Sequence, residues 1–140
     1  MKRYIIDTNV LISFVTDRNL EQQKKTVTIF EEAAALKALI LCHQFVLTEF
    51  VYVMDKVYHL PKEEIGKMIA DLIQMPGVEI VQECDFATVL SCWPVPFSDF
   101  GDAVIAAVAM SKKRATIVTF DRKLAGVLKS LGLGTYRFQS

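Results

Sequence analysis

Short apolar runs alternate with longer stretches of helical spacing along this chain, and that alternation restricts its fold more than any other feature. The runs read as buried strands because they are almost continuously apolar. Strands of this kind occur in parallel sheets that helices cover on both faces. We therefore predict an α/β fold, a three-layer α/β/α sandwich with a central, mostly parallel sheet of four or five strands. The expected strands are residues 2–6, 38–42, 78–81 and 116–119, with 135–138 as a fifth, edge strand.

The segments between the strands carry apolar residues at helical spacing and recognisable helix ends. Thr8 or Asn9 is expected to cap the first helix, and Ser98 the helix that leads to the fourth strand. Pro61 stands in the first turn of another helix, where a proline is tolerated. The expected helices are residues 10–15, 21–37, 44–58, 61–74, 85–93, a helix opening near 99, and 122–131.

Length and composition suggest one globular domain over residues 1–140, because 52% of the residues are hydrophobic and no repeat or linker is visible. A formal net charge of +0 argues against attachment to nucleic acid by bulk positive charge, although local basic patches stay open. The three cysteines form no metal-type pair, which fits a reducing compartment. The chain opens directly on a strand and has no bilayer-length apolar run, so we expect a soluble, cytoplasmic protein with no membrane partner.

Acidic residues follow the predicted strands at one edge of the predicted sheet. Asp7 follows the first strand and Asp121 the fourth, while Glu49 lies near the start of the helix after the second. Asp99 and Asp102 open the helix that leads to the fourth strand, and their spacing puts both on one helix face. Ligands of open parallel sheets bind at the carboxyl ends of the strands. Four or five carboxylates are therefore predicted to face one spot.

Oxygen-only ligands suit a hard cation, and clustered carboxylates need a positive charge between them. We therefore predict Mg²⁺ or Mn²⁺ as the cofactor, since no His or Cys stands at the spacing of a zinc site. Such a site supports attack of water on a phosphodiester. Neither a G-x-S-x-G motif nor another protein nucleophile is evident.

Each acid also has a structural interpretation that the sequence leaves open. Asp7 and Asp121 could cap the helices that follow them, and for Asp99 capping and ligation are equally supported. Glu49 could be an acid favoured by the helix dipole, although its apolar neighbours favour a buried, functional side chain.

Four motifs, in this order and spacing, resemble PIN-domain ribonucleases, and most of all the VapC-type toxins of prokaryotic toxin–antitoxin pairs. They are Asp-Thr-Asn-Val-Leu-Ile at 7–12, Thr-Glu-Phe-Val-Tyr-Val-Met at 48–54, Asp-Phe-Gly-Asp-Ala-Val-Ile-Ala-Ala at 99–107 and Thr-Phe-Asp-Arg-Lys-Leu at 119–124. The resemblance covers essentially the whole chain. It implies a metal-dependent endoribonuclease with an RNA substrate.

Carried over to this sequence, the resemblance assigns a role to each matching position. Asp7, Glu49, Asp102 and Asp121 match the acidic quartet that binds Mg²⁺ or Mn²⁺, and Asp99 matches an extra acid of many members. Asn9 and Thr119 match polar residues that steady the acids, and Phe50 stands where Leu is more usual. The resemblance also implies a homodimer and a small antitoxin protein as partner.

Residues outside the quartet are candidates for binding RNA or a second copy of the chain. Arg122 and Lys123 stand beside Asp121 and are candidates for contacting a phosphate backbone. The apolar helices at 45–58 and 61–74 are the expected dimer faces.

Three other functions compete with the toxin hypothesis. A PIN nuclease of RNA processing would carry the same acids, whereas a non-catalytic PIN interaction module would be expected to have lost some. A phosphatase of the haloacid-dehalogenase type also starts with an aspartate after the first strand. It needs a second acid two residues later, where this chain has Asn9.

Overall fold

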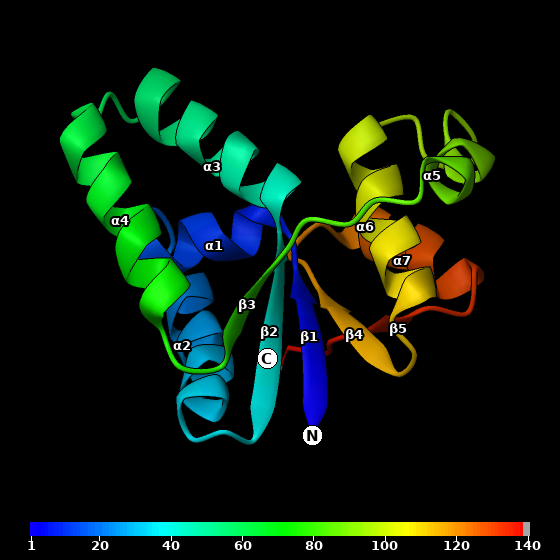
Figure 1. Cartoon of the computed structure of the whole chain (residues 1–140), viewed down its shortest axis with the longest axis horizontal. Coiled ribbons are helices and arrows are strands. Elements are labelled where there is room, and N and C mark those ends of the chain that lie inside the picture. The colour runs from blue at the N-terminus through cyan, green and yellow to red at the C-terminus, as the bar shows by residue number, and fades with distance from the viewer. Residues whose placement is uncertain (139–140) are drawn as a thin grey trace.

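Residues 1–138 are described by a computed structural model, and they form a five-stranded sheet surrounded by seven helices (Figure 1). All neighbouring strands are parallel, in the order β3-β2-β1-β4-β5. The predicted α/β class and parallel sheet are confirmed. The strands are β1 (Lys2–Ile6), β2 (Ala38–His43), β3 (Val78–Val81), β4 (Ala115–Val118) and β5 (Gly134–Thr135). The helices are α1 (Thr8–Val15), α2 (Leu20–Ala34), α3 (Gln44–Lys56), α4 (Lys62–Gln74), α5 (Phe86–Cys92), α6 (Phe100–Ser111) and α7 (Arg122–Ser130).

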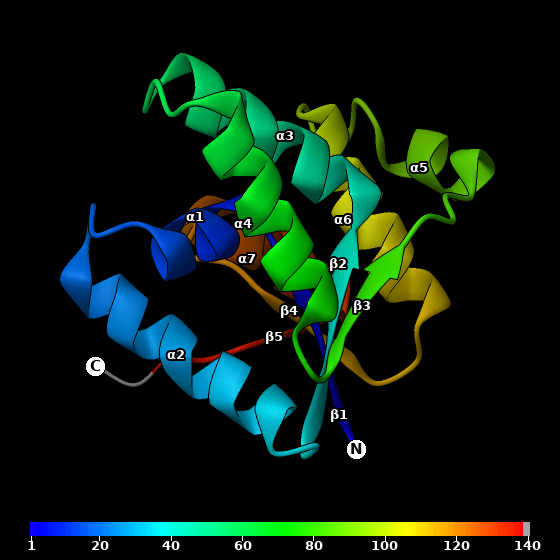
Figure 2. The same cartoon turned by 60° about the vertical axis from the view of Figure 1, so that its left-hand side comes forward.

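The strand order reverses direction once, and this reversal creates the two helical layers. The chain first steps from β1 to β2 to β3, and α1 to α4 cover one side of the sheet (Figures 1 and 2). It then returns to β4 on the other side of β1, and α5 to α7 cover the opposite side. Right-handed crossovers place helices on opposite faces when the direction of winding changes. The switch point therefore lies between β1 and β4.

The core lies where the sheet meets both helical layers. Ile5, Ile40 and Ile117 come from three adjacent strands and are fully buried. Helix α6 packs on the sheet through small side chains, since Ala103 and Ala106 are also fully buried. Small residues let this helix lie close to the strands, which brings its first turn to the sheet edge.

Most helix ends fall within a few residues of the predicted ones. Helix α1 begins at Thr8 rather than at residue 10, because Asp7 caps it in place of Thr8 or Asn9. Helix α2 ends at Ala34, earlier than the predicted 37, since Leu36 has a φ of 59° that no helix continues.

The predicted edge strand at 135–138 is shorter than expected. Among the described residues 134–138, only Gly134 and Thr135 pair with β4, and Tyr136 adds one hydrogen bond from its backbone N–H to the carbonyl of Ile117. Strand β4 ends at Val118, so Arg137 and Phe138 lie beyond the last residue of β4 with which they could pair. None of the helices in residues 1–138 has the length and apolar character needed to cross a membrane.

Candidate active site

The predicted acids come together in one cavity at the carboxyl ends of β1 and β4, outside the switch point. The cavity measures about 220 Å³, and we call it the acidic cavity. Open α/β sheets bind ligands at this place. Its lining residues are Asp7, Thr8, Asn9, Ile12, Phe45, Glu49, Val53, Asp99, Asp102 and Asp121. All five predicted acids and Asn9 are therefore brought to one place.

Asp7 is the most deeply buried of these acids, with 9% of its surface exposed. Its Oδ1 accepts a hydrogen bond of 2.8 Å from the backbone N–H of Thr8. Its Oδ2 accepts from the hydroxyl of Thr119 at 2.8 Å and from the amide of Asn9 at 3.2 Å. A buried carboxylate without such donors would be costly.

Thr119 links the ends of the neighbouring strands β1 and β4. While its hydroxyl donates to Asp7, its Oγ1 accepts from the backbone N–H of Asp121 at 3.1 Å and from Asn9 at 3.3 Å. Asn9 in turn accepts from the backbone N–H of Phe120 through Oδ1 at 3.2 Å. The resemblance predicted that Asn9 and Thr119 steady the acids, and both residues make the contacts that such a role requires.

Glu49 reaches the acidic cavity from α3, on the same helix face as Phe45 and Val53, four residues to either side. The close packing of α3 on α6 uses Gly101, because a Cβ at this position would overlap the ring of Phe45. The missing side chain lets the first turn of α6 lie against α3. Sequence reasoning gave Gly101 no role, and only the packing identifies it.

Three of the acids also cap helices, so the structural and the ligand interpretations coexist. Asp7 caps α1, Asp121 caps α7 by accepting from the N–H of Leu124, and Asp99 caps α6 by accepting from the N–H of Asp102. The predicted Ser98 cap is wrong. The Asp99 carboxylate fills that role one residue later, and the carbonyl of Ser98 instead accepts from the indole of Trp93.

Burial and like charge shift the acidities of two acids in the cavity. Burial first, and then the nearby Asp99 and other carboxylates, raise the pKa of Asp102 to about 7. Burial also raises the pKa of Asp7, while the hydrogen bonds from Thr119 and Thr8 oppose that rise. The N-termini of α1, α6 and α7 meet these acids, and helix N-termini favour negative charge. The cavity is therefore built to concentrate negative charge.

The donor set of the acidic cavity fits a hard divalent cation. Its ionisable groups are all carboxylates, and such oxygen donors suit Mg²⁺ or Mn²⁺. Within residues 1–138, no three acid, histidine or cysteine side chains are drawn together around one point as ligands. The carboxylates instead line the cavity walls, as mutual repulsion favours. All five carboxylates line the same cavity, and rotating a carboxylate toward a cation needs no backbone movement.

Comparison with known protein families agrees with the geometry. Residues 4–128, most of the chain, match the PIN domain family. The chain belongs to the PIN domain family. PIN domains are nucleases and generally use divalent metal ions. Family membership also removes the phosphatase alternative, which Asn9 already disfavoured.

Solved structures with the same fold include proteins named VapBC2 and VapC20 and a PIN domain endonuclease. VapBC2 from Rickettsia felis, solved bound to a DNA fragment of its promoter, matches with a TM-score of 0.71 and 18% identity over 98% of this chain and 99% of that one. VapC20 from Mycobacterium tuberculosis, a toxin that cleaves the sarcin–ricin loop, matches with a TM-score of 0.66 and 12% identity over 89% and 94%. The PIN domain endonuclease Utp24 matches with a TM-score of 0.57 and 15% identity over 99% and 86%. The search of curated proteins found no match.

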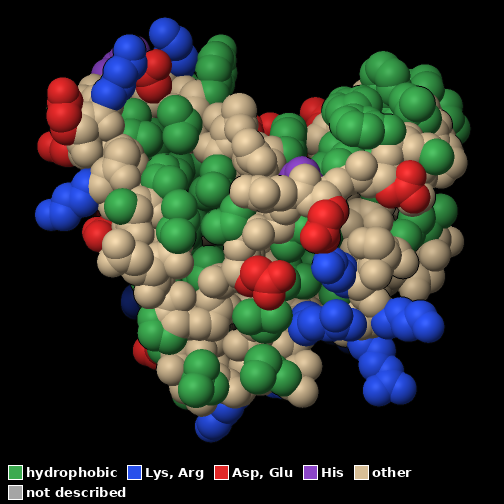
Figure 3. Space-filling view, in the orientation of Figure 1, with side chains coloured by type: hydrophobic (Ala, Val, Ile, Leu, Met, Phe, Trp, Pro, Cys, Tyr) green, Lys and Arg blue, Asp and Glu red, His purple; other side chains and the backbone are tan. Residues whose placement is uncertain are grey.

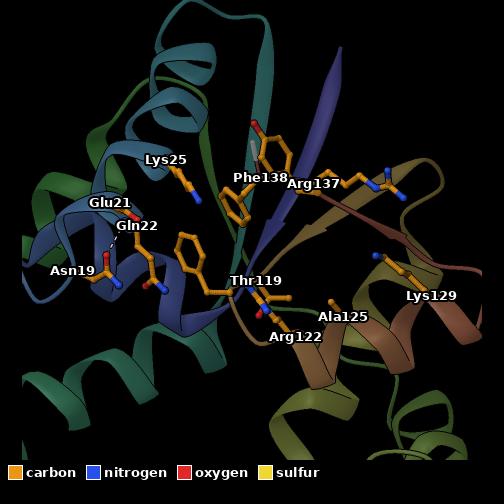
Figure 4. Close-up of a pocket in the computed structure, with 12 residues that line it drawn as sticks. Asn19, Glu21, Gln22, Lys25, Thr119, Arg122, Ala125, Lys129, Arg137 and Phe138 are labelled. Carbon is orange, nitrogen blue, oxygen red and sulfur yellow. Dashed lines mark hydrogen bonds between the residues drawn. The ribbon is translucent and has the colours of Figure 1, made fainter. Parts of the chain in front are cut away.

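A second cavity of about 440 Å³ adjoins the acidic one, and we call it the basic cavity (Figure 4). Of the two predicted RNA-binding residues, Arg122 lines it, whereas Lys123 lines neither cavity. Sequence reasoning missed Lys25, Lys129 and Arg137, which also line it. No local motif marks these three residues, because the fold alone brings them together.

Replacing Asp102 by Asn tests the crowding of charge in the acidic cavity. The pKa of Asp102 rises from 3.8 to about 7 on folding, so ionisation costs stability progressively as the pH rises from about 4 to above 7. In EDTA, Asp102→Asn should melt higher than the parent at pH 8 and equally at pH 4, by about 2–4 °C for each kcal/mol relieved. Thermal unfolding followed by circular dichroism measures the difference.

The matched control for this measurement is Asp71→Asn, which changes an exposed acid on α4. Its melting temperature should follow that of the parent at both pH values. Equal melting of the parent and Asp102→Asn at pH 8 would contradict the shared-site interpretation.

Proposed function

We propose that this protein is a Mg²⁺- or Mn²⁺-dependent endoribonuclease, and that it is the toxin of a type II toxin–antitoxin pair. The observation that carries the nuclease assignment is the acidic cavity, which gathers carboxylates from four segments at the switch point of a PIN domain. The resemblance of the chain to VapC proteins over nearly its full length supports the choice of RNA and of a toxin. We further propose that one domain over residues 1–140 acts in the cytoplasm.

In this proposal Asp7, Glu49, Asp102 and Asp121 hold the metal ion, with Asp99 at the outer rim. A bound Mg²⁺ or Mn²⁺ would neutralise the scissile phosphate and activate a water molecule for attack on phosphorus. The chain's own contribution is position. Thr119 and Asn9 both donate to Oδ2 of Asp7, and Thr119 also accepts from the backbone N–H of Asp121.

Changing Asp7, Glu49, Asp102 or Asp121 to its amide, one at a time, should abolish RNA cleavage. Each amide keeps the shape of the side chain and removes a negative charge that the cation needs. Cleavage of a single-stranded RNA, followed on a denaturing gel with Mg²⁺, Mn²⁺ or EDTA, measures the effect. We expect at least a ~100-fold loss for each variant, since ligand removal costs more than the 10–100-fold of a supporting residue.

The exposed acid Asp71 again provides the control, because Asp71→Asn should cleave like the parent. Mg²⁺ should also raise the melting temperature of the parent by linkage, and raise that of Asp102→Asn less. Full activity of Asp102→Asn would overturn the assignment of the site.

Thr119 is proposed as a positioning residue, and a valine at this position tests it. Thr119→Val keeps the side-chain shape but removes one donor to Asp7 and one acceptor for Asp121. We expect a 10–100-fold fall in cleavage or in Mg²⁺ affinity. Thr119→Ser restores the hydroxyl and should restore both. If Ser and Val behave alike, the hydroxyl has no positioning role.

Exposed apolar side chains support the proposal of protein partners. Tyr52 on α3 and Val57, the C-terminal cap of α3, are more than 60% exposed, as is Phe86 on α5, and Leu90 on α5 is 57% exposed. In the space-filling view, apolar side chains gather over α5, across a notch from α3 (Figure 3). Contiguous apolar surface of this kind commonly marks protein interfaces. We propose that α3 and α4 serve the homodimer, in agreement with the expectation from sequence.

Expression in cells tests the toxin role separately from nuclease chemistry. Induced wild-type protein should arrest growth, and Asp102→Asn should not, because arrest by a ribonuclease needs cleavage. Co-expression of a small protein encoded beside this one should restore growth and co-purify with it. A nuclease that cleaves RNA in vitro but leaves growth unaffected would instead favour a role in RNA processing.

A further inference from the structure

We propose that the basic cavity binds the RNA strand next to the cleaved bond, holding its phosphates with cations and a base on an aromatic surface. This proposal rests on the proposed ribonuclease function, because it gives the same substrate a second binding site. It assigns roles to Lys25, Lys129, Arg137 and Phe138, none of which belongs to the acidic cavity.

Uncompensated positive charge is the first observation. Lys25 enters the cavity from α2, Arg122 and Lys129 come from α7, and Arg137 comes from the C-terminal segment (Figure 4). Within residues 1–138, none of the four pairs with a carboxylate or donates a side-chain hydrogen bond. Glu21 is the single acid among the lining residues. Four free cations around one acid suit a polyanion.

An aromatic surface is the second observation. Phe120 and Phe138 stack with ring centroids 4.4 Å apart, and Tyr136 meets Phe138 edge to face at 4.9 Å. All three rings line the basic cavity and are only partly buried. Bases of single-stranded nucleic acids stack on such rings, and cations interleaved with aromatics are typical of single-strand grooves. An acidic protein segment would use the cations but would gain little from the rings.

Continuity with the acidic cavity is the third observation. Thr119 lines the basic cavity while its hydroxyl donates to Asp7, which lines the acidic one. Asp121 faces the acidic cavity and its neighbour Arg122 the basic one, with Cα atoms about 3.8 Å apart. Beyond them, a further hollow of about 280 Å³ shares Lys25, Tyr136 and Phe138 with the basic cavity and adds Lys24. The basic cavity therefore lies between the acidic cavity, which it meets at residues 119–122, and this further hollow.

Polar side chains in the basic cavity offer donors to a base edge. Gln22 accepts from the hydroxyl of Ser13 through its Oε1 at 2.9 Å, which leaves its NH₂ group free to donate. Asn19 accepts from the backbone N–H of Gln22 at 3.0 Å, and its NH₂ group is likewise unused by residues 1–138. Both amides line the basic cavity on the same side as Lys25, from the first part of α2 and its N-cap.

RNA binding by the cleavage-defective Asp102→Asn protein tests the proposal without loss of the substrate. Fluorescence anisotropy with a labelled single-stranded oligoribonucleotide, in Mg²⁺ and at several salt concentrations, gives the Kd and its salt slope. Adding Lys129→Ala and Arg137→Ala should weaken binding at least ~tenfold. The slope of log K against log salt should fall by about 1.4 in magnitude, at 0.7 for each phosphate contact of a single strand.

Two further variants separate local contacts from bulk charge and from stacking. Lys67→Ala with Lys113→Ala removes the same charge from exposed positions outside the cavity and should leave the Kd within twofold. Phe138→Leu keeps an apolar side chain but loses the ring, and should weaken binding at least ~fivefold without changing the salt slope.

The proposal fails if the Lys129 and Arg137 variant binds like its parent, or if the control pair weakens binding equally. It also fails if a labelled oligoglutamate of equal charge binds more tightly than the RNA, which would indicate an acidic protein partner. Its failure is distinguishable from failure of the nuclease assignment. If the wild-type protein cleaves no RNA, yet the Lys129 and Arg137 changes weaken RNA binding, the nuclease assignment is refuted and the basic cavity is supported as an RNA-binding site.

Discussion

The site depends on the hydrogen bonds that the buried carboxylate of Asp7 accepts. Its position at the end of β1 removes it from water, and desolvation of a carboxylate is costly unless donors replace the water. Thr119 supplies one of these donors from the residue after β4, so the ends of the neighbouring strands β1 and β4 are fixed to each other. The switch point of the sheet is thus closed by a hydrogen bond as well as by strand pairing.

Fixing the loop after β4 has consequences on both of its sides. The same Thr119 oxygen accepts from the backbone of Asp121, which orients the start of α7. From there, successive side chains face different hollows: Asp121 the acidic cavity, Phe120 and Arg122 the basic one. The short loop after β4 therefore contributes to the acidic cavity on one side and to the proposed RNA-binding surface on the other.

The sequence predicted the sheet and the five acids because both rest on local pattern. An apolar run followed by an acid specifies where that acid lies once the strands are parallel, and family resemblance pointed to the same residues. The N-cap of α6 was harder to predict, because Ser98 and Asp99 are both residue types that cap helices. The hydrogen bond from the N–H of Asp102 to the Asp99 carboxylate decides between them. The short β5 depends on where β4 ends, which is a property of its partner. Gly101 and the basic cavity depend on contacts between segments far apart in sequence.

The net charge of the chain does not predict where its positive and negative side chains gather. The chain carries 16 basic and 16 acidic residues, which excluded binding by bulk charge but said nothing about their arrangement. Folding separates positive from negative charge, with five carboxylates around one cavity and four cations around the neighbouring cavity. Salt screens the electric field of these charges within about 8–10 Å. A phosphate group therefore responds to the charges of the cavity that it enters, and hardly to the net charge of the whole protein. A neutral protein can therefore attract a polyanion with one cavity and hold its cation in the next, provided that a single loop keeps the two apart.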